Sequence, residues 1–235
     1  MNKSMASKDN LEKPVLRWGG LAGILGGIVF LFVPIVLFGF VPPAPSDPSA
    51  VVARFPSVSM AITVGNNLNF ISDMLDLALL VALYRALRGT NFAPALFGTV
   101  MSILGLGVIF TETQTQVAFA PLSDLYHASG STVAQQQQLG LIWAATQAMF
   151  FELDTAAGLL LSLGFIVLAI GMIKAPGFGK TTGVISAVLA ALSLIGISLI
   201  PVLGETSVVA VLAVPVFIVL PILWGWKTYR LSKAT

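Results

Sequence analysis

Apolar residues gather in six long runs along this chain, and polar and charged residues lie mainly between the runs. Because a bilayer core of ~30 Å requires about 20 apolar residues per helix, each run is long enough for one span. The pattern predicts an all-α, polytopic membrane helix bundle with six transmembrane helices over residues 18–226, and with tails at residues 1–17 and 227–235. The runs cover residues 18–40, about 65–84, about 92–111, a stretch that ends at Met172 and Ile173, about 181–203 and about 207–226.

The positions of lysine and arginine predict how this bundle is oriented. With six spans, eleven of the twelve basic residues fall on one side, and only Arg54 falls on the other. Cytoplasmic loops carry the excess of basic residues in membrane proteins. Both termini are therefore expected in the cytoplasm, and the chain is expected in the plasma membrane. The eleven residues are Lys3, Lys8, Lys13, Arg17, Arg85, Arg88, Lys174, Lys180, Lys227, Arg230 and Lys233.

Composition narrows the class of protein further. Hydrophobic residues make up 57% of the 235 residues and charged residues only 9%, whereas a soluble domain has about 25% charged residues. Lipid is therefore the expected solvent for much of the surface. With no cysteine and one histidine, a disulfide, a thiolate metal site and a histidine cluster are excluded, and neither a metal nor a cofactor is expected. A net charge of +2 gives no basis for a nucleic-acid partner.

Two segments allow more than one interpretation. The first run resembles a signal peptide, but it is longer than the ~7–15 apolar residues of a cleaved one. We expect it to be retained as a helix, followed by an extended outer loop at residues 41–50. In the outer segment 112–153, Thr132 and Gln135 have capping-box spacing. A helix over residues 131–153 is expected there, either as an outward extension of the fourth span or as an extra surface helix.

Four polar residues in the second span mark the candidate site. Asn66, Asn69, Asp73 and Asp76 follow one another at intervals of three, four and three residues, which places them on one helical face. Both aspartates lie about 13–18 Å from Arg85 along the helix, near the middle of the bilayer, where an ionisable group costs roughly 2.5–3.5 kcal/mol on insertion scales. We expect these residues to line an outward-opening pocket that binds a small solute or cation. The alternative is that Asp76 only hydrogen-bonds a neighbouring helix.

Three further acidic residues lie at the predicted outer ends of the spans. Glu112 follows the third span, and Glu152 and Asp154 precede the apolar part of the fourth. One interpretation is that they gather at the mouth of the pocket and attract cations. The other is that they solvate the helix ends.

Small residues recur along the first span. Gly19, Gly23 and Gly27 are four residues apart, and such a face lets another helix approach closely. Packing within one bundle is the favoured interpretation, and an interface with a second copy or with another membrane protein is the alternative.

Two sequence stretches carry a family resemblance. Asp76 followed by ALYRALRGTN at residues 82–91, and the turn KAPGFGKTTGV at residues 174–184, resemble the uncharacterised bacterial membrane proteins of the domain of unknown function 4386 family. The resemblance covers about residues 15–200 and implies a six-helix fold with no established activity. The fourth predicted span departs from the family because it lacks the histidines associated with that segment.

Three functional classes follow from these features. The first is a small-solute or cation binding or transport protein that uses Asp73 and Asp76. The second is a non-catalytic accessory subunit that docks a membrane partner. An intramembrane enzyme is the weakest, because aspartyl intramembrane proteases carry their aspartates on different helices, whereas these two share one.

Overall fold

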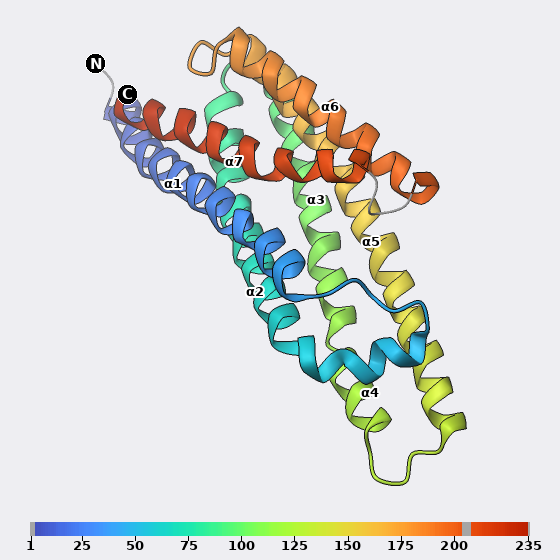
Figure 1. Cartoon of the computed structure of the whole chain (residues 1–235). Coiled ribbons are helices and arrows are strands. Elements are labelled where there is room, and N and C mark those ends of the chain that lie inside the picture. Colours follow the sequence, from blue (N-terminus) through green and yellow to red (C-terminus); the bar gives the residue numbers. More distant parts are fainter. Residues whose placement is uncertain (1–2, 204–207, 235) are drawn as a thin grey trace.

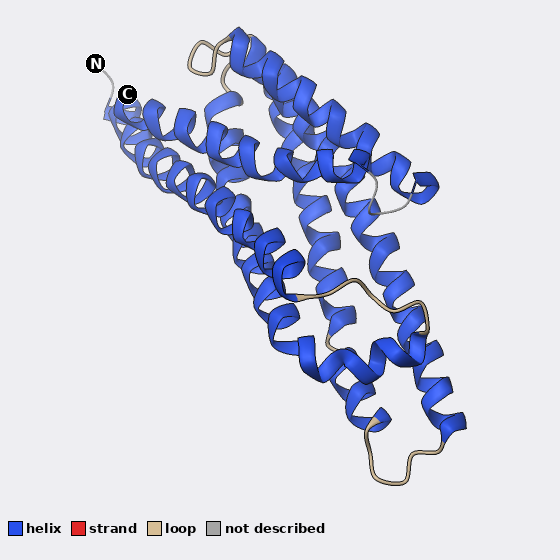
Figure 2. Ribbon diagram, in the orientation of Figure 1, coloured by secondary structure: helices blue, strands red, loops and turns tan. Residues whose placement is uncertain are grey.

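The structure, a computed structural model, describes residues 3–203 and 208–234, and the side chains of residues 12–200, 202 and 214–234. Every regular element within these residues is an α-helix, as Figure 1 and Figure 2 show. The helices are α1 (Lys3–Phe40), α2 (Pro48–Leu87), α3 (Phe92–Gln116), α4 (Phe119–Tyr126), α5 (Val133–Ile173), α6 (Lys180–Leu203) and α7 (Val208–Ala234).

Four helical stretches of the described chain are long and apolar enough to cross a bilayer, and they mark this chain as a membrane protein. They are Glu12–Phe40, Phe92–Tyr126, Val133–Ile173 and Lys180–Ile200. Helix α2 is not among them, since asparagines and aspartates interrupt its apolar sequence.

The six long helices run up and down in chain order, with α4 as a short addition at one end. Helix α1 packs against both α2 and α7, α3 packs against α5, and α6 lies between α5 and α7. Helix α2 also contacts α3, α5 and α7. The two ends of the chain lie together at one end of the bundle (Figure 1), as an even number of long antiparallel helices requires.

The observed helices are longer than the predicted spans. Helix α1 begins within the predicted tail 1–17, and α7 continues through the predicted tail 227–235 to Ala234. Helix α2 begins at Pro48, so the extended outer loop is shorter than the predicted 41–50. The reason is local: the Asp47 side chain accepts hydrogen bonds from the backbone N–H groups of Ser49 and Ala50, both at 3.2 Å, which is a favourable N-cap.

Residues 133–153 belong to a single helix with the fourth predicted span. Helix α5 runs without a break over 41 residues, and it starts with the predicted capping box of Thr132 and Gln135. Of the two alternatives, the outward extension is therefore the observed one. The extra helix of the segment 112–153 is α4, which lies between α3 and this extension.

The glycines of α1 pack within the bundle, as favoured from the sequence. A Cβ atom added at Gly19 or Gly23 would lie 2.3 Å or 2.7 Å from side-chain carbons of α2. On the other side of α1, a Cβ atom at Gly20 or Gly27 would lie 2.5 Å or 2.6 Å from atoms of α7. Close approach on both sides therefore requires residues without a side chain.

Candidate functional site

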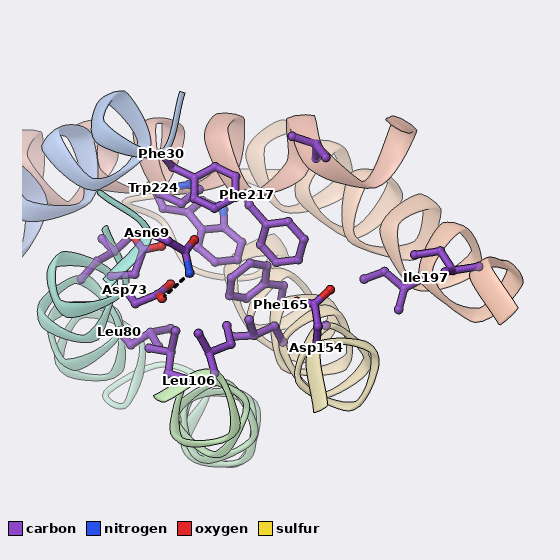
Figure 3. A pocket seen from close by; sticks show the side chains of 18 residues that line it. Phe30, Asn69, Asp73, Leu80, Leu106, Asp154, Phe165, Ile197, Phe217 and Trp224 are labelled. Atoms are coloured by element: carbon purple, nitrogen blue, oxygen red, sulfur yellow. Dashed lines mark hydrogen bonds between the residues drawn. The ribbon is translucent and has the colours of Figure 1, made fainter. Parts of the chain in front are cut away.

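One cavity lies at the centre of the bundle, and all six long helices contribute to its wall. Its volume is about 220 Å³, which is more than ten times the ~10–15 Å³ that a single water needs. The wall is mostly apolar, with three carboxyl side chains from α2 and α5: Asp73, Asp76 and Asp154. Figure 3 shows Asn69 and Asp73 on α2 across the cavity from Asp154 on α5.

The α2 side of the cavity holds three of the four predicted ligand-binding residues. Asp73 is buried, with 6% of its surface exposed, and the Asn69 Nδ2 atom donates a hydrogen bond of 3.1 Å to its Oδ2 atom. Asp76 lies one turn deeper, and its buried Oδ1 atom has no hydrogen-bond partner. The part of the predicted helical face that carries these three residues therefore points inward. Among the described residues, none makes the hydrogen bond to Asp76 from a neighbouring helix that the alternative interpretation required.

Helix α1 holds this part of α2 in place. The Ser72 hydroxyl donates a hydrogen bond of 3.0 Å to the carbonyl of Gly26. A Cβ atom at Gly26 would lie 2.9 Å from the Asp76 Oδ1 atom. The absence of a side chain at Gly26 therefore leaves room for the Asp76 carboxyl group beside the α1 backbone.

Aromatic side chains form the wall opposite α2. Phe30, Phe165 and Phe217 contact one another in a series, with ring centroids 6.2 Å and 6.1 Å apart, and Trp224 meets Phe165 edge to face at 5.0 Å. The Trp224 indole N–H donates a hydrogen bond of 2.7 Å to the Ser186 hydroxyl. The indole N–H is thus hydrogen-bonded to α6, and the part of the ring that lines the cavity is apolar.

No signal in the sequence marks this aromatic wall. Its residues come from α1, α5 and α7, and each sits in a run where an aromatic residue is ordinary lipid-facing or core sequence. Only the packing of α7 across the bundle brings them to the carboxyl groups of α2 (Figure 3).

Asp154 lines the central cavity and is also exposed at the surface of the bundle, so it lies at the rim of this cavity. The prediction measured its height from Lys174, but Gly171 is the residue of α5 that lies level with the end of α2. Asn91, just after α2, donates a hydrogen bond of 2.7 Å to the Gly171 carbonyl. Asp154 precedes Gly171 by 17 residues, and Asp73 precedes Leu87 by 14 residues. Asp154 is therefore only three residues farther from this end of the bundle than Asp73, which is ~4.5 Å or about one turn.

Glu112 is buried on α3. Only 6% of its surface is exposed, and among the described residues its Oε2 atom has no hydrogen-bond partner. Glu152 differs, because its side chain is exposed and lies outside the cavity wall. Of the three residues of the predicted outer mouth, Glu112 is therefore buried, Asp154 is exposed at the rim of the central cavity, and Glu152 is exposed outside the cavity wall.

Asn66 lies outside the central cavity and belongs to a second cavity closer to α4. Its Nδ2 atom donates a hydrogen bond to the Gln116 Oε1 atom, and both residues line an outer cavity of about 560 Å³. Asn69, one turn deeper, lines the central cavity. The polar stripe of α2 therefore runs from one cavity into the next, with the amide pair of Asn66 and Gln116 beside the boundary.

Arg54 stabilises the wall of this outer cavity. Its Nη1 atom donates hydrogen bonds of 3.0 Å and 2.7 Å to the carbonyls of Pro42 and Pro43. The bonds fasten the loop between α1 and α2 onto α2. The one basic residue predicted outside thus has a structural role.

The donor set of the central cavity favours an organic ligand over a metal ion. Among the described residues, no group of three or more histidine, aspartate or glutamate side chains is arranged to hold a metal. The carboxyl groups lie on two sides of the cavity, and apolar carbon fills the wall between them. A small metal ion needs several oxygen ligands at once, which this wall does not offer.

Comparison with known proteins finds no match: no family model, no curated protein and no solved structure matches this chain.

Proposed function

We propose that this chain is a plasma-membrane protein that binds a small solute in the central cavity and carries it across the bilayer. In this proposal six helices span the membrane, and both termini are cytoplasmic. A single observation carries it: the ionisable residues of α2 lie deep in the bundle and face a cavity built by all six long helices. Intramembrane carboxyl groups that face a cavity commonly mark a substrate or ion pathway.

The course of the polar stripe favours transport over a closed binding site. Asn66 lines the outer cavity, and Asn69 lines the central one. A solute that enters beside α4 would therefore meet polar groups on the same helix at each turn. The resemblance to the domain of unknown function 4386 family fits a six-span fold and adds no activity to this proposal.

The alternative, an accessory subunit that docks a membrane partner, lacks a specific observation. The glycine face of α1 had favoured it, but Gly19, Gly23 and Gly27 are occupied by α2 and α7. What remains for a partner is lipid-facing apolar surface, which every membrane protein has.

Thiol labelling tests the transport proposal without knowledge of the solute, because the chain has no cysteine. We expect Asn69→Cys to react with a membrane-impermeant cationic methanethiosulfonate from outside in intact cells and from inside in inverted vesicles. A thiol in lipid stays protonated and unreactive, so Leu104→Cys, on the exposed surface of α3 (56% exposed), is the control. If Asn69→Cys reacts from neither the outside nor the inside, the transport proposal is overturned and the accessory role is favoured.

A further inference from the structure

We infer that the ligand of the central cavity is a small organic monocation with an apolar, preferably aromatic, body, such as a primary amine on a ring. This inference rests on the proposed function and narrows it to a substrate class. It depends on three features of the cavity: the sign of its charges, the unpaired state of those charges, and the chemistry of the opposite wall.

The charged groups of the cavity are all acidic. Asp73, Asp76 and Asp154 line it, and none of the described lysine, arginine or histidine side chains does. Within the described part of the chain, the ion pair between Arg88 and Glu12 is the one salt bridge, and it lies at the end of the bundle near the termini. An anionic ligand would therefore meet repulsion from two sides without any cation to offset it.

The carboxyl groups lack the donors that they would need within the protein. Asn69 gives one N–H to Asp73, but no described residue donates a hydrogen bond to Asp76, whose carboxyl group lines the cavity. A buried acceptor without a donor loses its hydrogen bonds to water without replacement. An ammonium group supplies up to three N–H donors and a compensating charge, whereas an uncharged hydrocarbon would leave the acceptor unpaired.

The opposite wall selects the rest of the ligand. Phe30, Phe165 and Phe217 present their rings to the cavity, and Trp224 adds its ring while its N–H is engaged by Ser186. A hydrated inorganic cation would lose its water shell against carbon and gain too few oxygens in exchange. An organic cation gains both apolar burial and an attraction of its charge to the ring faces.

The geometry places the two parts of such a ligand. Figure 3 shows Asp73 at one side of the cavity, with Phe165 and Phe217 across it and nearer to Asp154. An ammonium group would sit beside Asp76 and Asp73, with its body between Leu80, Leu106 and the rings. The volume of about 220 Å³ limits the ligand to a compact molecule of about one ring with a short chain.

Equilibrium binding of radiolabelled phenylethylamine, which is protonated at pH 7, tests this inference on the purified full chain in detergent. Two competitors match its shape but not its charge: 2-phenylethanol, which is neutral, and 3-phenylpropanoate, which is anionic. We expect phenylethylamine to bind saturably, and each of the two competitors to bind about tenfold or more weaker than phenylethylamine. Sodium chloride serves as the inorganic cation and is expected not to compete beyond the effect of an equal concentration of choline chloride.

Variants assign the binding to these carboxyl groups. Asp76→Asn and Asp73→Asn are expected to weaken binding about tenfold or more each, as the loss of one partner of a buried charge pair does. Asp124→Asn, an exposed acid of α4, is the matched control and should bind as the unaltered chain does. Size-exclusion chromatography verifies that each variant is folded. If only one of the two aspartate variants is folded, weaker binding by that variant is enough to assign the binding to these carboxyl groups.

The outcomes separate this inference from the proposed function. Equal binding of 2-phenylethanol, or specific competition by sodium, would overturn the organic-cation class but leave solute binding in place. If phenylethylamine does not bind but Asn69→Cys is labelled from both sides, the organic-cation class is overturned and solute transport stays in place. If phenylethylamine does not bind and Asn69→Cys is not labelled, the proposed function is overturned as well.

Discussion

At the scale of single residues, Asp76 is held inside the bundle with one carboxylate oxygen unpartnered. If the residue is kept for ligand binding, its removal should stabilise the empty protein. We predict that Asp76→Leu raises the melting temperature in detergent, since an unpaired buried acceptor costs ~1–3 kcal/mol and each kcal/mol corresponds to about 2–4 °C in a chain of this size. Asp124→Leu, on the exposed side of α4, should leave the temperature nearly unchanged. A clear decrease for Asp76→Leu would identify Asp76 as a structural hydrogen-bond partner instead.

Glycine at position 20 gives a second residue-scale prediction. A Cβ atom there would lie 2.5 Å from the Tyr229 backbone nitrogen and 2.8 Å from the Gly225 carbonyl oxygen, and backbone atoms cannot move aside as a flexible side chain can. Gly20→Ala should therefore lower stability by about 1–3 kcal/mol through overpacking, measured as a lower melting temperature. Gly107→Ala is the matched control. Because nothing lies within 4 Å of its added Cβ atom, it should be neutral or stabilising by up to ~1 kcal/mol through helix propensity.

Single residues were predictable from the sequence where one helix decides the outcome. The face that carries Asn69, Asp73 and Asp76 follows from spacing alone, and the small-residue face of α1 follows in the same way. The level of Asp154 relative to Asp73 could not be predicted, because it depends on the position of α5 along α2, which is fixed by contacts such as that of Asn91 with Gly171. The aromatic wall depends on three separate helices, so periodicity within any one of them could not reveal it.

At the scale of elements, the helices α2 and α5 reach well beyond one bilayer thickness. They contain 40 and 41 residues, or ~60 Å each at 1.5 Å per residue, against a hydrocarbon core of ~30 Å. Hydropathy detects only the apolar part of such a helix, which explains why the predicted second span began at residue 65 rather than at Pro48. The start of α5 was predicted correctly because a capping box is a local signal that lipid does not alter.

The outer ends of α2 and α5 are joined by their own small core. Phe119 of α4 stacks on Trp143 of α5 at 4.1 Å, and Phe55 of α2 meets Trp143 at 5.0 Å. These residues form a cluster with Val52, separate from the main core. The outer ends are therefore expected to loosen independently of the bundle around the central cavity.

Trp143→Ala tests this independence. We predict that deuterium uptake increases over residues 119–145, because a large aromatic side chain removed from a core costs about 3–5 kcal/mol. Uptake over residues 155–173 of the same helix should stay near that of the unaltered chain. Trp226→Ala, at an exposed position of α7, should change neither region. An equal increase along the whole of α5 would show that the helix responds as one unit.

At the scale of the whole molecule, the alternating helices sort the charges by end. The segment between α2 and α3 and the segment between α5 and α6 lie at the end of the bundle where both chain ends are found (Figure 1). Arg85 and Lys174, which border these segments, are thus at the same end as Arg230 near the end of α7. Arg54 lies toward the other end, where it bonds the loop carbonyls of Pro42 and Pro43.

This sorting predicts the orientation in the membrane, because the end rich in basic residues stays in the cytoplasm. We predict that Ala234→Cys is protected from a membrane-impermeant thiol reagent in intact cells and reacts once the cells are permeabilised. Ser46→Cys, in the loop between α1 and α2, should react in intact cells, and the unaltered chain, which lacks cysteine, gives the background. Reaction of Ala234→Cys in intact cells would reverse the orientation. The outer cavity beside α4 would then face the cytoplasm, and a solute that enters through it would come from inside the cell. The labelling experiment therefore also determines from which side of the membrane a solute reaches the central cavity past Asn66 and Gln116.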